Sequence, residues 1–210
     1  MLNWPQELSG PSWRARGAIA YFDQPARGAP NASPGANATH ASTIDPEARL
    51  YRKGRGREAK HCYLGHALVE NRNGLIVEAC VTRAEGSAER NPALAMIEGF
   101  ADRPNPITLG ADKGYDTRDL VNEARAKNVT PHVAQNLSGP RSAIDGRVTR
   151  HVGYAASQRI REPIEEAFGW GKEIGAMRRT HLRGLPRVGL ALSFTAAAYN
   201  LVGLPKLLAT

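Results

Sequence analysis

The feature that most constrains the fold lies at residues 61–83, where two β-rich runs flank a short polar turn. The runs are "HCYLGHALVE" and "LIVEACVTR", and the pair Asn73 and Gly74 stands between them. An Asn-Gly pair favours a tight turn with positive φ, which joins antiparallel strands. The sequence therefore predicts a β-hairpin here, and with it a sheet.

The segments after this hairpin alternate between helical and strand patterns. A helix is expected at 91–101, a strand at 106–111, a helix at 117–128, a strand from 129, and helices from about 155. Such an order predicts an α/β fold with a mixed sheet flanked by helices.

The first 37 residues differ in composition from the rest of the chain. The stretch "QPARGAPNASPGAN" is rich in Pro, Gly, Ala, Ser and Asn and has no helical or strand period. It cannot bury enough apolar surface to offset its chain entropy. We therefore expect an irregular, disordered segment at 1–37 and a folded domain at 38–210.

The most apolar run of the chain is "VGLALSFTAAAYNLVGL" at 188–204. It is slightly short for a membrane span, it contains Ser193, Thr195 and Asn200, and Pro205 follows it. We expect a helix buried against the body of the domain, and no membrane partner.

The charge balance points to a polyanionic partner. The chain has 28 Lys and Arg against 20 Asp and Glu, a formal net charge of +8, which favours nucleic acid or an anionic membrane surface. Residues 141–187 hold ten Lys or Arg against five acids, and residues 49–60 hold six against one. These clusters are candidates for phosphate contacts, although for any single arginine solvated surface is the simpler interpretation.

Asp112 is a candidate metal ligand because it directly follows the expected strand at 106–111. Carboxylate oxygens suit Mg²⁺ or Mn²⁺. The alternative is that Asp112 caps the loop or the next helix. Asp116 is the better candidate for the helix cap, since it immediately precedes "TRDLVNEARAKN".

A charged stripe is expected on the helix near residues 157–179. Arg161, Glu165 and Lys172 are four and seven residues apart, which leaves all three within about 40° of one line. Glu166 lies about 100° away. Pro163 predicts a kink, or a helix start near Glu162. The stripe is either solvated surface or part of a metal-dependent nucleic-acid site.

Several stretches occur in an order that resembles one known family. The chain closely resembles bacterial insertion-sequence transposases of the DDE class, in the group named after insertion sequence five, over about residues 38–206. The resemblance implies a ribonuclease-H-like fold and Mg²⁺-dependent (or Mn²⁺-dependent) cleavage and strand transfer of DNA, with three acids holding the metals. It rests on "THASTIDPEARLYRKG", "GHALVENRNGLIVEA", "EGSAER", "GADKGYDT", "RHVGYAASQRIREPIEEAFGWGK" and "RGLPRV".

The resemblance assigns roles residue by residue. Asp112 matches the second catalytic Asp, and Glu165 matches the catalytic Glu, with Glu166 as a second choice. Arg161 and Lys172 match the basic partners in the family signature of Tyr, two residues, Arg, three residues, Glu, six residues, Lys. Gln158 stands where the signature has Tyr, and Tyr154 lies one turn earlier.

The first Asp of the family has no clear counterpart. In the family it lies on an early strand upstream of the "THAST" stretch, and here the two candidates are Asp23 and Asp45. The surroundings of Asp23 do not resemble those in the family, whereas Asp45 belongs to the matched region but precedes Pro46 in an expected loop. We therefore expect an N-terminally truncated transposase, whose sheet lacks its early central strand and whose metal site has two of three carboxylates.

Three functions remain open at this point. The chain could cut and join DNA at the element ends and the target, alone or with another chain. It could be a catalytically inactive remnant that binds DNA or a full-length transposase, or a fragment without function. The expected location is the bacterial cytoplasm, in association with the nucleoid, and a homo-oligomer is one expected assembly.

Overall fold

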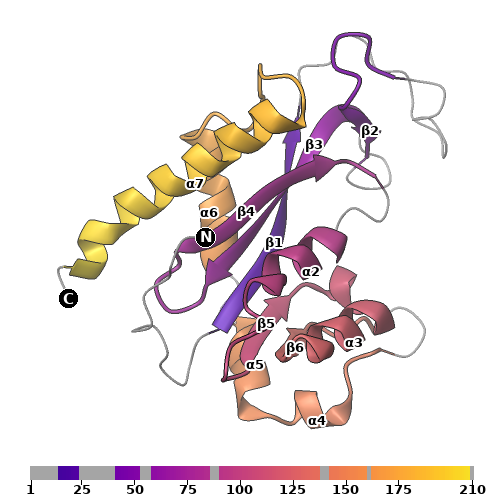
Figure 1. Cartoon of the computed structure of the whole chain (residues 1–210), viewed down its shortest axis with the longest axis vertical. Coiled ribbons are helices and arrows are strands. Elements are labelled where there is room, and N and C mark those ends of the chain that lie inside the picture. The colour runs from indigo at the N-terminus through magenta and orange to yellow at the C-terminus, as the bar shows by residue number, and fades with distance from the viewer. Residues whose placement is uncertain are drawn as a thin grey trace.

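A computed structural model describes residues 14–23, 41–52, 58–85, 90–137, 142–159 and 162–208. Its centre is a six-stranded mixed sheet in which β2, β3, β1, β5 and β6 follow one another, while β4 also pairs with β3. Figure 1 shows helices on both sides of this sheet. The expected mixed α/β sheet with flanking helices is therefore confirmed.

The elements follow the predicted order closely. Strand β3 pairs antiparallel with β4, and Gly74 in the turn between them has a φ of 72°, so the hairpin prediction is confirmed. The strands are β1 (Arg14–Asp23), β2 (Arg49–Tyr51), β3 (Lys60–Glu70), β4 (Ile76–Arg83), β5 (Ile107–Ala111) and β6 (Val129–Val133). The helices are α2 (Arg90–Glu98), the 3₁₀ turn η2 (Lys113–Tyr115), α3 (Arg118–Ala126), α4 (Gly146–Thr149), α5 (Val152–Arg159), α6 (Glu162–Glu173) and α7 (Leu185–Leu208).

Strand β1 corrects two expectations. It lies at the centre of the sheet, antiparallel to β3 and parallel to β5. The prediction of an irregular segment over 1–37 is therefore wrong for Arg14–Asp23, and the sheet does have an early central strand. The apolar run "GAIAYF" inside β1 has the composition of a buried strand, and its two partner strands supply the pairing. The remainder of 1–37 lies outside the described residues.

Two groups of buried side chains fill opposite faces of the sheet. Because successive residues of a strand face opposite sides, Leu68 of β3 packs with α2 and α3, whereas Tyr63 packs with α6 and α7. The first group consists of Leu68, Met96, Ile97, Ile107, Leu109, Ala124 and Val129. The second consists of Ala48, Tyr63, Met177, Val188 and Leu192, with Phe168 against it.

Helix α7 is the longest helix that the structure describes, with 24 residues. Val188, Leu192 and Ala196 are buried along one side of it. Within the described residues, it is the one helix long and apolar enough to cross a membrane, and 17% of the apolar window Leu185–Pro205 is buried. The expectation of a helix buried against the domain is right for this inner side and wrong for the rest of the helix.

Candidate metal-ion site

Asp112 occupies the position that the sequence predicts, immediately after β5. Its side chain is exposed. One carboxylate oxygen accepts a hydrogen bond of 2.8 Å from the backbone N–H of Lys113 and so caps η2. The two readings of Asp112 are therefore compatible, because an exposed carboxylate at a strand end caps a turn and still presents oxygen to solvent.

Asp116 does not cap α3, contrary to expectation, since Thr117 takes the N-cap position. Its carboxylate instead accepts hydrogen bonds from the backbone N–H groups of Asn136 (2.7 Å) and Ala143 (2.9 Å). Partial burial alone would raise the pKa of the Asp116 carboxyl, but these and neighbouring hydrogen bonds hold that pKa below its ordinary value. Asp116 thus fixes the loop that follows β6.

Glu165 lies on α6, which begins at Glu162 as the position of Pro163 predicts. Ile164 is buried on the core side of this helix, whereas Glu165 and Glu166 are both exposed. Exposure alone therefore does not choose between the two glutamates. Helix α6 packs against β1 (Figure 1), so the helix of Glu165 covers the strand that neighbours β5.

The basic members of the predicted stripe are only partly described. Lys172 is half-buried in the last turn of α6, seven residues after Glu165 and so on the same side of the helix. Arg161 lies outside the described residues. In the part of the chain that the structure describes, no group of three or more His, Cys, Asp or Glu side chains is placed to hold a metal ion.

The backbone pairing of β1 with β5 fixes which residues lie level with Asp112. Arg14, Ala15 and Arg16 pair with Thr108, Leu109 and Gly110, and continuing the pairing residue by residue places Ala18 level with Asp112. The neighbours of Ala18 are Gly17 and Ile19, so this level of β1 carries no acid. Asp23 pairs with Cys62 instead, five residues further along and about 16 Å away along the strand.

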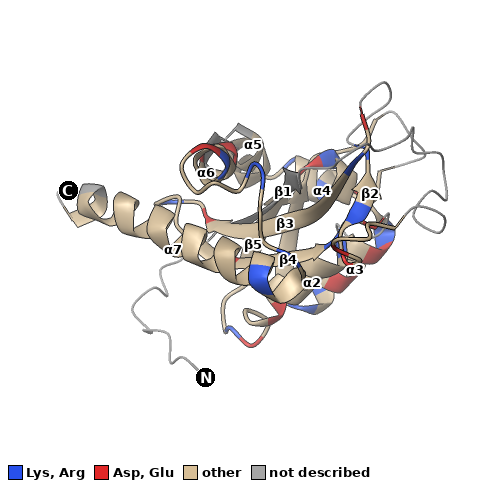
Figure 2. Ribbon diagram, turned by 90° about the horizontal axis from the view of Figure 1, so that it is seen from above, with Lys and Arg blue, Asp and Glu red and all other residues tan. Residues whose placement is uncertain are grey.

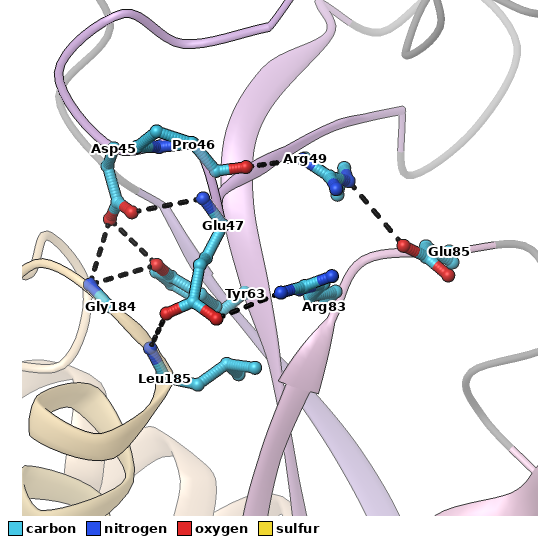
Figure 3. Close-up of polar contacts among 9 residues, drawn as sticks. All are labelled: Asp45, Pro46, Glu47, Arg49, Tyr63, Arg83, Glu85, Gly184 and Leu185. Atoms are coloured by element: carbon cyan, nitrogen blue, oxygen red, sulfur yellow. Dashed lines mark hydrogen bonds and ion pairs between the residues drawn. The ribbon is translucent and has the colours of Figure 1, made fainter.

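Asp45 has a structural role in the loop before β2, as Figure 3 shows. Its side chain is 2% exposed. One oxygen accepts hydrogen bonds from the Tyr63 hydroxyl (2.7 Å) and the Gly184 N–H (3.2 Å), and the other accepts one from the Glu47 N–H (3.3 Å). Burial, reinforced by the Asp45 carboxylate, raises the pKa of the Tyr63 phenol. These contacts tie the loop to β3 and to the start of α7.

Glu47 and two arginines extend this arrangement (Figure 3). Glu47 accepts hydrogen bonds from the Leu185 N–H (2.8 Å) and from Arg83 (3.0 Å). Arg49 pairs with Glu85 at 3.5 Å. Since Tyr63 pairs with Phe22 of β1, the whole cluster lies toward the Asp23 end of β1, away from the level of Asp112.

Sequence reasoning missed a set of contacts between α5 and the strand β6. Gln158, at the signature's Tyr position, donates to the backbone oxygen of His132 (2.8 Å), and the Tyr154 hydroxyl donates to the oxygen of Val133 (3.0 Å). The buried Ser157 hydroxyl lies 2.8 Å from Nδ1 of His132. Gln158 and Tyr154 therefore both hold α5 on β6. Their spacing of one helical turn was the available signal.

The comparison with protein families decides the identity. The family model described as "Transposase DDE domain" matches residues 33–201. The chain belongs to this transposase family. The matched region contains Asp112, Glu165 and Lys172, and it begins after β1. The central strand of this transposase domain is thus supplied by residues outside the family match.

Further comparisons add little. No curated protein matches the chain. A solved structure, "Crystal structure of a pre-cleavage Mos1 transpososome", is similar with a TM-score of 0.30 and 12% identity, over 90% of this chain and 55% of that one. The chain therefore spans about half the length of that protein, and a similarity this weak supports no statement about fold or chemistry.

The donor chemistry of the transposase domain suits a hard divalent cation. Mg²⁺ keeps several waters and is commonly held by one or two carboxylates together with substrate phosphates. Asp112 and Glu165 both carry exposed carboxylates. Asp112 directly follows β5, and Glu165 lies on α6, the helix that covers β1. Carboxylate oxygen is the type of ligand that such a cation takes from a protein.

Proposed function

We propose that this protein acts in DNA transposition through divalent-metal phosphoryl transfer, with Asp112 and Glu165 as the metal-binding carboxylates. The observation that carries the proposal is the exposed Asp112 at the end of β5, beside the strand that α6 covers. Bound there, Mg²⁺ or Mn²⁺ would activate the attacking oxygen and stabilise the leaving one. The substrates are the ends of the element and the target DNA.

Basic residues next to this site are proposed to contact the DNA backbone. Lys172 lies on the Glu165 side of α6, and the signature assigns the same role to Arg161. Exposed arginines continue through the segment after α6, at positions 178, 179 and 183, and into the first turn of α7 at position 187. Cations placed in this way release counterions from DNA, so binding should weaken steeply with salt.

We also propose a family group and a fold class for the chain. We assign the chain to the group named after insertion sequence five on the motifs quoted above, and its fold to the ribonuclease-H-like class. The placement of β1 between an antiparallel and a parallel neighbour supports that class. A location at the bacterial nucleoid follows from DNA as the partner.

A second candidate function is favoured by the pairing of β1. No acid stands at Gly17, Ala18 or Ile19, the residues of β1 around the level of Asp112. The adjacent strand therefore adds no third carboxylate there. The chain would then be a catalytically inactive member of the family that binds DNA or a full-length transposase.

A nicking assay separates the two candidates. The full chain is incubated with Mg²⁺ or Mn²⁺ and a supercoiled plasmid that carries the matching element ends, beside Asp112→Asn and Glu165→Gln. Glu166→Gln is the matched control, because Glu166 is the adjacent glutamate and is also exposed. The proposal predicts that nicking is lost in the first two variants and retained in the control.

Other results change the conclusion in defined ways. If nicking is lost in Glu166→Gln and retained in Glu165→Gln, Glu166 is the metal ligand in place of Glu165. No nicking together with salt-sensitive DNA binding would establish the inactive candidate. If the chain neither nicks nor binds DNA, both candidate functions are overturned. Titration with Mn²⁺ in the absence of DNA gives an independent test of whether Asp112 and Glu165 hold a metal at all.

A further inference from the structure

Helix α7 is fixed to the domain along one side. Val188, Leu192 and Ala196 are buried at intervals of four residues. The side-chain amide of Asn200 accepts a hydrogen bond from the N–H of Ile76 and donates one to its carbonyl oxygen, each of 2.8 Å. This pair of hydrogen bonds joins the helix to the first residue of β4 and so determines which side of α7 faces outward.

The outward side carries a regular apolar stripe. Its members recur at alternating intervals of four and three residues, and all are exposed. At about 100° per residue they fall within roughly 80° of one another, nearly opposite the buried side. We call this set the outer stripe: Leu190, Phe194, Ala197, Leu201, Leu204 and Leu208.

The exposure of the outer stripe is large and its surroundings are uncharged. Phe194 is 68% exposed, Leu201 65% and Leu208 85%. The sequence from 188 to 205 contains no Lys, Arg, Asp or Glu, although the protein as a whole has a net charge of +8. Figure 2 shows α7 as an almost uncharged helix whose C-terminal half extends beyond the sheet.

We propose that the outer stripe is a dimer interface, on which α7 of one copy packs against α7 of a second copy. Apolar residues at alternating intervals of three and four form the seam of two helices that pack side by side. The stripe runs from Leu190 to Leu208, or about 27 Å along the helix. A second copy presents an identical helix, so a twofold axis would match the stripe to itself. This inference does not depend on the metal site.

The area of the stripe is sufficient for such a dimer. A fully buried Leu or Phe covers on the order of 100 Å², so the outer stripe would bury roughly 500–600 Å² per copy. The total of about 1,000–1,200 Å² lies at the lower limit of specific interfaces. We therefore expect a dimer that dissociates at low protein concentration.

A lipid bilayer is the competing occupant of this surface, and the inner side of α7 argues against it. Insertion across a membrane would break the two hydrogen bonds between Asn200 and Ile76. It would also remove Val188 and Leu192 from the cluster that they form with Tyr63 and Met177. A bilayer, moreover, has no requirement for three- and four-residue spacing.

The test is sedimentation equilibrium of the full chain over a range of concentrations, with two single substitutions on neighbouring residues. Leu201→Glu places a charge in the outer stripe. Val202→Glu places the same charge on the next residue, which is similarly exposed (59%) but about 120° from the stripe's centre. For the wild type and Val202→Glu, the apparent mass should rise with concentration toward that of a dimer. Leu201→Glu should raise the dissociation constant of the dimer at least tenfold.

Two additional measurements complete the test. Circular dichroism melting of each variant establishes that a monomeric Leu201→Glu is folded, and Phe194→Glu provides a second variant in the stripe. Co-sedimentation with phosphatidylcholine vesicles tests the bilayer. A wild type that stays monomeric at every concentration, equal effects of Leu201→Glu and Val202→Glu on association, or monomers bound to vesicles would each overturn the proposal.

Discussion

Carboxylates at two levels of the central sheet are used in different ways. Toward the Asp23 end of β1, Asp45 is buried and accepts hydrogen bonds from Tyr63, Gly184 and Glu47. At the end of β5, Asp112 is exposed, and its carboxylate accepts a hydrogen bond from the backbone N–H of Lys113. Both were candidates for the same metal site from the sequence. Burial separates a carboxylate that holds the fold from one that can reach a ligand.

The largest expected effect concerns Asp45. Asp45→Ala should lower the free energy of unfolding by about 2–4 kcal/mol, because it removes a charged acceptor and leaves the O–H of the buried Tyr63 side chain without its acceptor. The Gly184 N–H also loses the Asp45 oxygen and keeps only the Tyr63 hydroxyl oxygen as an acceptor. Urea denaturation measures the change. Tyr63→Phe, which removes the hydroxyl donor, should cost about 1–2 kcal/mol. A loss below about 1 kcal/mol for Asp45→Ala would remove the contrast with Asp112.

An intermediate effect, dependent on pH, is expected at Asp116. Hydrogen bonds hold its folded-state pKa below the ordinary value of about 3.9. A depressed pKa contributes stability that is present above the unfolded-state pKa and is lost as the pH falls through the folded-state pKa. Asp116→Asn should therefore lower stability at neutral pH and flatten the loss of stability below about pH 4. Urea unfolding of both proteins at several acidic pH values tests this, and parallel pH curves would contradict it.

The smallest effect on stability is expected at the proposed metal ligands. Asp112→Asn and Glu165→Gln should each change the free energy of unfolding by less than about 0.5 kcal/mol, because both side chains are exposed. Urea denaturation without added metal provides the comparison with Asp45→Ala. If Asp112→Asn proved as destabilising as Asp45→Ala, Asp112 would be a structural residue, and the site would need another ligand.

Local signals in the sequence predicted the local parts of the fold. Asn73 and Gly74 predicted the hairpin, Pro163 predicted the start of α6, and the apolar run before Asp112 predicted a strand that ends there. Each of these signals lies within the element that it defines. The roles of Asp112 and Glu165 in metal binding stay predictions.

Features that depend on distant partners were not predictable. Gly184 reaches Asp45 across 139 residues, so no local pattern identifies Asp45 as a structural acid. The strand character of β1 was hidden by the Pro- and Gly-rich stretch after it, and depends on pairing with β3 and β5. The outer side of α7 is a different case, because its three- and four-residue spacing is in the sequence and only its exposure required the structure.

The position of β1 also has a consequence for synthesis of the chain on the ribosome. Arg14 pairs with Thr108, so this central strand is made roughly 90 residues before its parallel neighbour, an interval of about 5 to 20 s at usual rates of translation. Strand β3 emerges earlier and can pair with one side of β1. The other side stays open until β5 is made. During that time the nascent chain exposes one unpaired edge of this strand to chaperones and to other nascent copies.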